Sequence, residues 1–421
     1  MGPTTLFDKS FLQSLSLDES VIFDNFFNGV ICPLFFIETL ADLEKAIRQG
    51  RTPEEEVGII ADKTPEMSGY PNVYHSTLAV QNLLGQEIVM DGRVMIAGGR
   101  PVKVDGKSGV VFRQSPEQEA FNRWQKRDFL HVERKIAKAW RQSLNAIDLN
   151  MLASGMRALG IDPQNCKSLD DAKEVSENFI SGTDHVPDRI KLACLILNAS
   201  PACEEFAIQA WKERGSRAFS EHAPYAAHVV SVELFFQLAL AANLIGTERS
   251  SNRIDIAYLF YLPFCQVFAS SDKLHRRSAP YFLRKDQSFV WGLDLKAALK
   301  TLVEQYAAFS VEIAETGLHG FAPAPPPDDA ECLLTQLWDR HMSPSWRNLH
   351  KERVPREALQ DPDLVKHLNR FTDAPTLPPD QVDWGPGEAE MMGLQRTIRR
   401  RKGSFWQVPK NIGEAKDERS S

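Results

Sequence analysis

The stretch NRIDIAYLFYLPFCQVFASSDK, residues 252–273, decides the fold class of this chain. Asn252 to Leu262 has the spacing of a helix, which Pro263 ends because proline lacks the N–H that continues a helix. Phe264 to Ala269 then predicts a short buried strand, and Ser270-Ser271-Asp272 predicts the turn after it. This succession of helix, apolar strand and polar turn is typical of an α/β unit.

The same alternation occurs in the first sixty residues. Thr5-Leu6-Phe7 predicts a strand, and a helix-like stretch follows from Ser10. The apolar run Val30 to Ile37 predicts a buried strand, although Pro33 delays its start. Glu38 to Arg48 then predicts a helix with one apolar face. Strand, helix, strand and helix in this order favour a parallel sheet flanked by helices.

A long stretch of different character separates these two α/β segments. The turn signals Asp91-Gly92 and Asp105-Gly106 predict a small β-meander near residues 85–114. From Ser115 the pattern becomes helical, and its most apolar helix is expected at 223–246.

These patterns divide the chain into three regions. We expect an α/β core from residues 1–60 and 225–317, and an insertion at 61–224 that is mostly helical after its β-meander. Residues 318–421 form an extension punctuated by prolines, and its last dozen residues are expected to be disordered.

Composition narrows the possible classes of protein. Hydrophobic residues make up 43% and charged residues 25% of the 421 residues, which excludes a wholly disordered, collagen-like or disulfide-scaffold protein. The formal charge of −7 means that any nucleic-acid binding must use a local basic surface. The six scattered cysteines favour a reducing cytoplasm. Glu233 interrupts the longest apolar run, which therefore predicts a buried helix and a soluble protein without a membrane span.

Four acidic residues lie where a parallel sheet would bring them together. Asp8 follows the first predicted strand, Glu38 follows the second, and Asp272 follows the strand at 264–269. Asp255 lies in the first turn of the helix before that strand. Working sites of open parallel sheets lie at the carboxyl ends of the strands. Several carboxylates at one place favour a Mg²⁺ or Mn²⁺ site, because without a cation they repel one another.

Each acid also has a purely local interpretation. Asp8 could cap the helix near Ser10, and Asp272 could be an ordinary turn residue. Asp255 could belong to a capping arrangement at the start of its helix, and Glu38 could lie on a solvated helix face. The local interpretation is favoured for each residue alone, and only the combination favours a site.

Two groups of basic residues could contact a phosphate-bearing partner. Lys273, Arg276 and Arg277 follow Asp272 directly, where they could hold a nucleic-acid backbone or simply form a solubilising loop. The second group, residues 396–402, could be a C-terminal arm that touches nucleic acid or a charged, solvated helix.

Three short motifs resemble those of the PIN-like nuclease superfamily. They are Leu6-Phe7-Asp8-Lys9-Ser10, Phe35-Phe36-Ile37-Glu38, and the stretch 252–273 with its early Asp255 and its [ST]-x-D ending Ser270-Ser271-Asp272. The resemblance covers roughly residues 1–60 and 225–300, and it is that of a bacterial-type member with a large insertion.

This resemblance implies a cytoplasmic, Mg²⁺- or Mn²⁺-dependent nuclease that hydrolyses RNA, or DNA. By position, Asp8, Glu38, Asp255 and Asp272 would be the catalytic, metal-binding acids. The residues implied in substrate binding are Ser270, Lys273, Arg276 and Arg277. The alternative is a PIN-like module without catalysis that binds protein or nucleic acid, in which the acids point apart or are used in salt bridges and caps.

Overall fold

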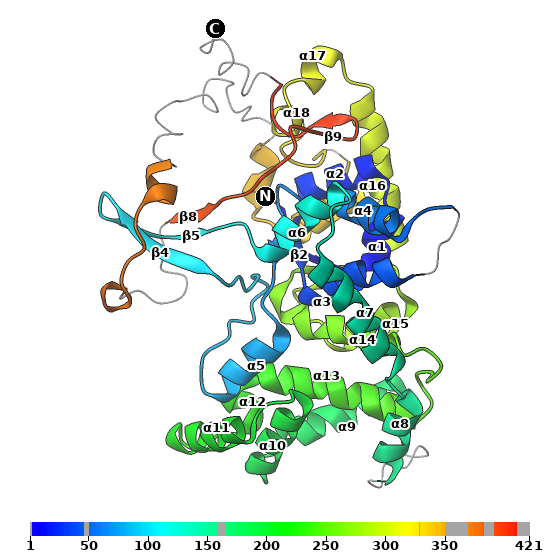
Figure 1. The fold of residues 1–421 in the computed structure, drawn as a ribbon, viewed down its shortest axis with the longest axis vertical. Coiled ribbons are helices and arrows are strands. Elements are labelled where there is room, and N and C mark those ends of the chain that lie inside the picture. The colour runs from blue at the N-terminus through cyan, green and yellow to red at the C-terminus, as the bar shows by residue number, and fades with distance from the viewer. Residues whose placement is uncertain are drawn as a thin grey trace.

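A parallel α/β sheet forms the centre of the protein. The computed structural model describes residues 2–45, 50–158, 166–327, 329–349, 369–382 and 391–410. Within these residues, five strands pair in the order β3-β2-β1-β6-β7, and every neighbouring pair is parallel (Figure 1). The strands are β1 (Thr4–Phe7), β2 (Asn28–Ile31), β3 (Tyr70–Pro71), β6 (Val267–Ser270) and β7 (Ser288–Trp291). The predicted fold class, a parallel sheet flanked by helices, is confirmed.

The strand order contains one reversal. The chain moves outward from β1 to β2 and β3, and it later returns to the other side of β1 with β6 and β7. Connections therefore leave the carboxyl ends of β1 and β6 in opposite directions, which opens a crevice between them. Because β3 pairs with β2, the core extends to residue 71, beyond the expected boundary at residue 60.

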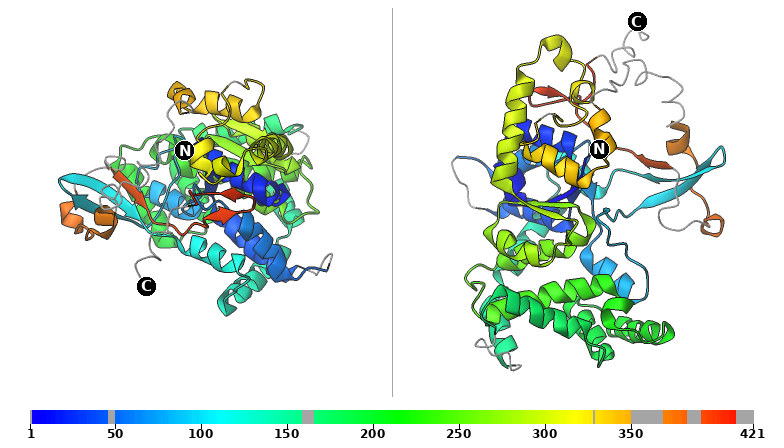
Figure 2. Two further views of the ribbon diagram at one scale, coloured as in Figure 1. Left: turned by 90° about the horizontal axis from the view of Figure 1, so that it is seen from above. Right: turned by 180° about the vertical axis from the view of Figure 1, so that it is seen from behind.

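Helices from distant parts of the chain pack together on the sheet. The α2 helix contacts both α4 and α16, and α14 contacts α15 (Figures 1 and 2). The sheet-flanking elements are α1 (Lys9–Ser14), α2 (Leu17–Phe26), α3 (Pro33–Leu40), η1 (Ala41–Glu44), α4 (Pro53–Lys63), α14 (Asn252–Ala257), η3 (Tyr258–Phe264), α15 (Lys273–Ser278), η4 (Ala279–Tyr281) and α16 (Gly292–Ala307).

Two predicted boundaries are wrong because of proline. The apolar run 30–37 is not one strand: β2 ends at Ile31, and Pro33 begins α3, where its fixed φ angle suits the first helical position. Glu38 therefore lies near the end of α3 and does not open a helix. The helix predicted at 252–262 is also divided, because α14 gives way to the tighter 3₁₀ helix η3, which contains Pro263.

The region between β3 and β6 is mostly helical, as expected. Its α13 helix is long and apolar enough to cross a membrane, but 83% of its most apolar window is buried inside the protein, where it packs on α8 and α9. The helices are α5 (His75–Leu83), α6 (Pro116–Gln125), α7 (His131–Asn145), α8 (Leu149–Ala158), α9 (Leu169–Ser181), α10 (Val186–Ile196), α11 (Pro201–Glu213), α12 (Phe219–His222) and α13 (Pro224–Ala241).

The predicted β-meander is only partly formed. Asp105-Gly106 turns between β4 (Gly99–Val104) and β5 (Lys107–Phe112), as expected, but the described residues 88–96 contain no strand. The third strand is instead β8 (Met391–Leu394), which comes from the C-terminal region and runs parallel to β5. Sequence pattern could not reveal this pairing because the two strands lie far apart in the chain.

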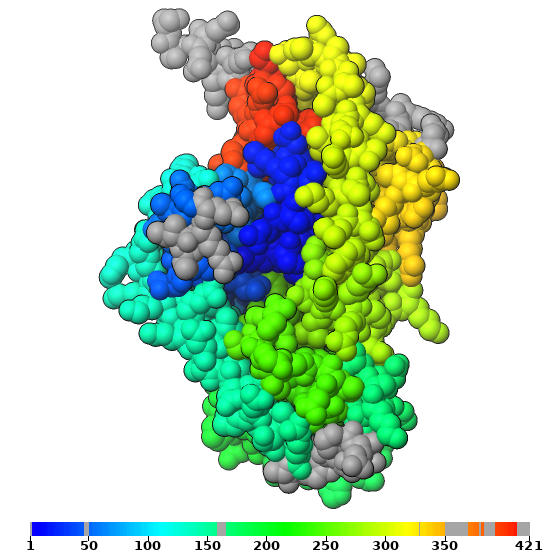
Figure 3. Space-filling view, turned by 90° about the vertical axis from the view of Figure 1, so that its right-hand side faces the viewer, coloured from blue at the N-terminus to red at the C-terminus, as the bar shows by residue number. Residues whose placement is uncertain are grey.

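The C-terminal region returns to the core. Its described elements are α17 (Val311–Ala314), α18 (Leu318–Phe321), α19 (Leu333–His341), η5 (Pro344–Asn348), η7 (Pro379–Gln381), β9 (Arg401–Lys402) and β10 (Phe405–Trp406). Figure 3 shows its last described part, in red, beside the N-terminal segment in blue. The predicted disordered end, residues 411–421, lies outside the described residues.

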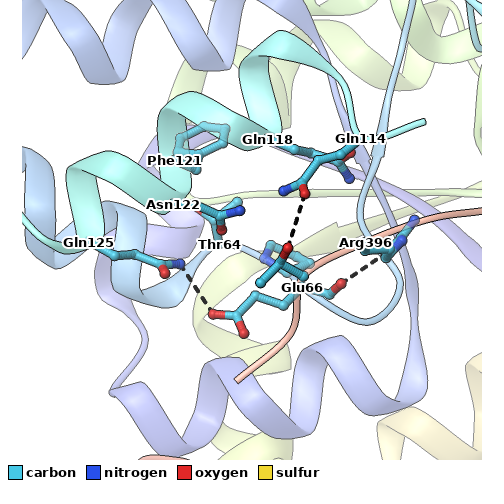
Figure 4. Close-up of a pocket in the computed structure, with 10 residues that line it drawn as sticks. Thr64, Glu66, Gln114, Gln118, Phe121, Asn122, Gln125 and Arg396 are labelled. Atoms are coloured by element: carbon cyan, nitrogen blue, oxygen red, sulfur yellow. Dashed lines mark hydrogen bonds between the residues drawn. The ribbon is translucent and has the colours of Figure 1, made fainter. Parts of the chain in front are cut away.

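The second basic group is not a helix, and two of its residues, Arg399 and Lys402, form ion pairs within the protein, whereas Arg400 and Arg401 are exposed. Lys402 is 1% exposed and lies in β9, with its Nζ 3.7 Å from Glu66 Oε1. Arg399 also pairs with Glu66, at 2.5 Å. Arg396 donates to the carbonyl oxygen of Glu66 (Figure 4) and to that of Gly69. These charges attach the C-terminal region to the loop before β3.

Lys402→Met should destabilise the protein by about 3 kcal/mol, because removing one partner of a buried ion pair leaves the other charge poorly compensated. Lys410→Met is the matched control: its bridge to Glu315 is exposed, and its loss should cost at most about 1 kcal/mol. Urea unfolding of the two variants measures the difference. Equal losses would show that the buried pair does not anchor this region.

Candidate active site at the carboxyl edge of the sheet

The four predicted acids converge on the crevice between β1 and β6. Asp8 directly follows β1, and Asp272 lies two residues beyond the end of β6. The other two acids reach the same edge on helices, Glu38 on α3 and Asp255 on α14. The charges of Asp272, Glu38 and Asp8 all act on the Asp255 carboxyl, which places the four groups within electrostatic reach of one another.

Asp8 is the buried centre of this cluster, with 4% of its surface exposed. Its Oδ1 accepts the N–H of Phe11 at 2.8 Å and so caps α1, as the local interpretation expected. Its Oδ2 accepts the hydroxyls of Ser10 and Ser270, each at 2.7 Å, and lies 3.3 Å from Nδ1 of His275. The cap and the cluster are therefore compatible roles of one side chain.

Hydrogen-bond geometry gives His275 a proton on each ring nitrogen. Its Nε2 lies 2.5 Å from the carbonyl oxygen of Asp255, which can only accept. Its Nδ1 lies 2.8 Å from Ser270 Oγ, whose own hydrogen is donated to Asp8. Nδ1 must therefore donate as well, and the fully buried ring is an imidazolium cation among carboxylates.

The two charges of this buried pair stabilise each other. Burial alone would raise the pKa of Asp8, but the hydrogen bond and charge of His275 outweigh it and lower that pKa. Burial alone would lower the pKa of His275, but the hydrogen bond and charge of Asp8 raise it to about 9. The pair therefore places the positive charge of His275, compensated by the Asp8 carboxylate, at the centre of the site.

Glu38 lies at the edge of the cluster and is partly exposed. Its Oε2 accepts the hydroxyl of Tyr258 at 2.5 Å. Desolvation raises the pKa of Glu38, against the lowering effects of Lys9 and Tyr258. Lys9 itself pairs with Asp42 at 2.6 Å, so Asp42 is neutralised outside the cluster.

Asp255 is the least compensated of the four acids. Its Oδ2 is buried without a hydrogen-bond partner among the described residues. Burial raises its pKa to about 7, and the charges of Asp272, Glu38 and Asp8 add to the increase while His275 opposes it. The carboxylate of Asp272 is better hydrogen-bonded than that of Asp255, because its Oδ1 accepts the N–H of Leu274 at 2.6 Å and caps α15.

The donor set suits a hard divalent cation, since it consists of carboxylate oxygens and includes the unpartnered Oδ2 of Asp255. As the side chains lie, however, no three His, Cys, Asp or Glu groups in the described part of the chain are close enough to hold one metal ion. Carboxylates that meet at an edge are therefore present, but a closed metal cage is not.

Comparison with known proteins found no match to this chain. The sequence matches no protein-family model, and neither the curated proteins nor the solved structures contain a match. The properties of this site must therefore be argued from its own geometry.

The residues expected to bind substrate divide into two kinds. Ser270 is fully buried and bonds Asp8, His275 and the N–H of Asp272, so it orders the cluster from within. Lys273, Arg276 and Arg277 are exposed beside it. The Arg276 guanidinium lies 5.0 Å from the ring centroid of Trp291, at the end of β7, and Arg277 donates to the Leu244 carbonyl oxygen.

His275 and Tyr258 are the site residues that sequence reasoning missed. His275 lies three residues after Asp272, so helical spacing was a usable signal. Tyr258 lies within an apolar run that is otherwise buried core, and no local signal separates it from its neighbours.

The His275 pair predicts a specific loss of stability at alkaline pH. A histidine whose pKa is raised from 6.5 to about 9 stabilises the fold fully below pH 6.5, and this contribution is lost as pH rises toward 9. In EDTA, wild type should lose about 3 kcal/mol over this window. His275→Gln should show little of this loss, and urea unfolding at several pH values measures both. An unchanged slope in the variant would contradict the pairing.

Asp255→Asn should stabilise the protein at pH 8, by about 1–2 kcal/mol after allowance for partial solvent screening. A carboxyl whose pKa is raised to about 7 costs stability progressively as pH rises from about 4 through 7, so the gain should vanish near pH 4. Urea unfolding in EDTA measures both values. Asp286→Asn is the control, since its bridge to Arg284 lowers the pKa of Asp286 and no gain is expected.

Proposed function

We propose that the protein is a Mg²⁺- or Mn²⁺-dependent nuclease with a PIN-like core, acting on RNA in preference to DNA. The observation that supports this proposal is the convergence of Asp8, Glu38, Asp255 and Asp272 at the strand-order reversal. Carboxylates that lie close together repel one another unless a cation compensates them, and Asp255 is the acid that the described residues leave uncompensated.

Each residue has a role in this proposal that follows from its position. Asp8 and Asp272 would hold the ion, and Glu38 and Asp255 would complete its carboxylate surroundings. A bound divalent cation supplies a water of lowered pKa and polarises a phosphoryl oxygen. Ser270 and His275 keep Asp8 ionised and oriented from behind, since both bond its Oδ2 side.

The exposed cations would position the nucleic acid. Lys273, Arg276 and Arg277 lie immediately beyond Asp272, where they could contact backbone phosphates. Arg276 above Trp291 adds a flat surface on which an unpaired base could stack. Contacts to backbone phosphates and a surface for an unpaired base together suit single-stranded nucleic acid better than a duplex.

A second candidate function, a PIN-like module that binds protein or nucleic acid without catalysis, has one observation in its favour. The imidazolium of His275 already compensates the charge of Asp8, so the protein itself supplies a cation at the centre of the cluster. In this candidate the remaining acids would contribute only to surface charge.

Cleavage of end-labelled single-stranded RNA and DNA tests the proposal. Wild type should cut RNA with Mn²⁺ or Mg²⁺ but not with EDTA, and Asp8→Asn/Asp272→Asn should reduce the rate at least about 100-fold because the metal contributes several kcal/mol. The matched control is Asp188→Asn/Asp339→Asn, which removes two carboxylates of exposed ion pairs elsewhere.

Two outcomes would reject catalysis at this site. Metal-dependent cleavage that survives in the Asp8/Asp272 variant would belong to another site or another protein. Inactivity of wild type, together with no Mn²⁺-induced rise in its thermal midpoint, would favour the binding module.

A further inference from the structure

A cavity lies at the carboxyl end of β3, on the same edge of the sheet as the acids. Its volume is about 340 Å³, which falls within the range of roughly 300–1,000 Å³ that is typical of pockets for small organic ligands. Three segments form most of its walls: residues 70–74 in and after β3, residues 96–98 before β4, and residues 112–118 from the end of β5 into α6. Thr77 and Leu394 complete the lining.

Asn72 is an unsatisfied polar group in the wall of this cavity. The residue is 6% exposed, and both its Nδ2 and its Oδ1 are buried without a hydrogen-bond partner among the described residues. A buried amide that makes neither bond is unfavourable in the free protein. Because the two amide atoms have almost no accessible surface in the free protein, the side chain has to turn toward the cavity before a ligand that offers one donor and one acceptor side by side relieves this cost.

The remaining lining supplies aromatic surface and one charged side chain of each sign, Arg113 and Glu117. Tyr74 is 43% exposed and Phe112 is partly buried, so both offer apolar ring surface to a ligand. Arg113 is exposed at the same wall. The amide side chains of Gln114 and Gln118 line this cavity and also the small neighbouring pocket shown in Figure 4.

This combination is that of a nucleobase site. An asparagine amide forms paired hydrogen bonds with the N6 and N7 atoms of adenine, and proteins bind unpaired RNA bases by stacking them on aromatic rings. A cation at the rim would face the attached phosphate.

The position of the cavity agrees with the site described above. β3 lies two strands from β1, so their carboxyl ends are about 10 Å apart at the usual spacing of strands. Given a rise of about 3.4 Å per nucleotide in a stacked strand, this distance corresponds to only a few nucleotides.

We propose that the cavity beside Asn72 binds an adenine base of the RNA strand whose backbone lies at the acidic cluster. This inference rests on the proposed nuclease function for the identity of the polymer, but base binding itself requires neither metal nor catalysis. The amide of Asn72 would read the base, Tyr74 would contact its face, and Arg113 would contact its phosphate.

Calorimetric titration of the full chain with AMP in EDTA tests this proposal. AMP should bind at least about tenfold more tightly than ribose 5-phosphate, which lacks the base, and also more tightly than CMP or UMP. Asn72→Leu should weaken AMP binding about tenfold or more, since a paired contact to a base contributes roughly that factor. The thermal midpoint of this variant should be unchanged or higher, because the replaced amide has no hydrogen-bond partner in the described ranges of the chain.

Two further variants separate recognition from folding. Asn28→Leu is the matched control: Asn28 Oδ1 is also buried without a partner, but it lies at the opposite, amino end of β2. AMP affinity should be unchanged there. Tyr74→Ala, at an exposed side chain, should weaken AMP binding without affecting the fold.

Several results would overturn the inference. They are undetectable AMP binding to wild type, equal affinity for ribose 5-phosphate, unchanged affinity in both Asn72→Leu and Tyr74→Ala, or tighter binding of an N-acetylated peptide amide than of AMP. Binding by Asp8→Asn/Asp272→Asn separates the two proposals. Unchanged AMP affinity in a protein without cleavage would retain the base site and reject the nuclease.

Discussion

The buried contact of Asp8 with Ser270 and His275 is the interaction on which the site depends. It joins the end of β1 to the end of β6 and to α15, and through the Asp255 carbonyl it also joins α14. The participating segments are separated by most of the chain, and the contact closes only when β1 and β6 are neighbours. An ionised aspartate can stay buried there because His275 supplies both a hydrogen bond and the opposite charge.

The acids around this pair differ in how well the fold satisfies them. Asp8 and Asp272 each cap a helix, so part of their charge is stabilised locally. Asp255 Oδ2 has no hydrogen-bond partner in the described part of the chain, and burial with its acidic neighbours raises the pKa of Asp255. Proteins tolerate such unfavourable groups at functional sites, where the loss of stability is offset elsewhere in the fold. Extensive apolar burial around the sheet and the Lys402–Glu66 anchor are two such contributions here.

The large insertion and the C-terminal region both contact the core and stabilise it. The helix α13 is almost wholly enclosed, and its Tyr225 donates to the carbonyl oxygen of Phe260, within η3 beneath the site. The C-terminal region adds β8 to the hairpin β4–β5, and its Arg399 forms a salt bridge with Glu66. Arg399 and Lys402 there therefore stabilise the internal acid Glu66, whereas the basic residues of α15 remain at the surface beside the acidic cluster.

The sequence by itself determined the fold class, three of the central strands (β1, β2 and β6) and the edge at which Asp8, Glu38, Asp255 and Asp272 meet, because short apolar runs and the polar residues that follow them are local signals. It misjudged the Pro33 and Pro263 boundaries, where apolar content does not distinguish a strand from a helix. The tertiary structure alone decided that His275 is a buried cation, that the Asn72 amide has no hydrogen-bond partner among the residues the structure describes, and that β8 pairs with β5. Burial, protonation and long-range pairing depend on which distant segments meet, and no local pattern contains that information.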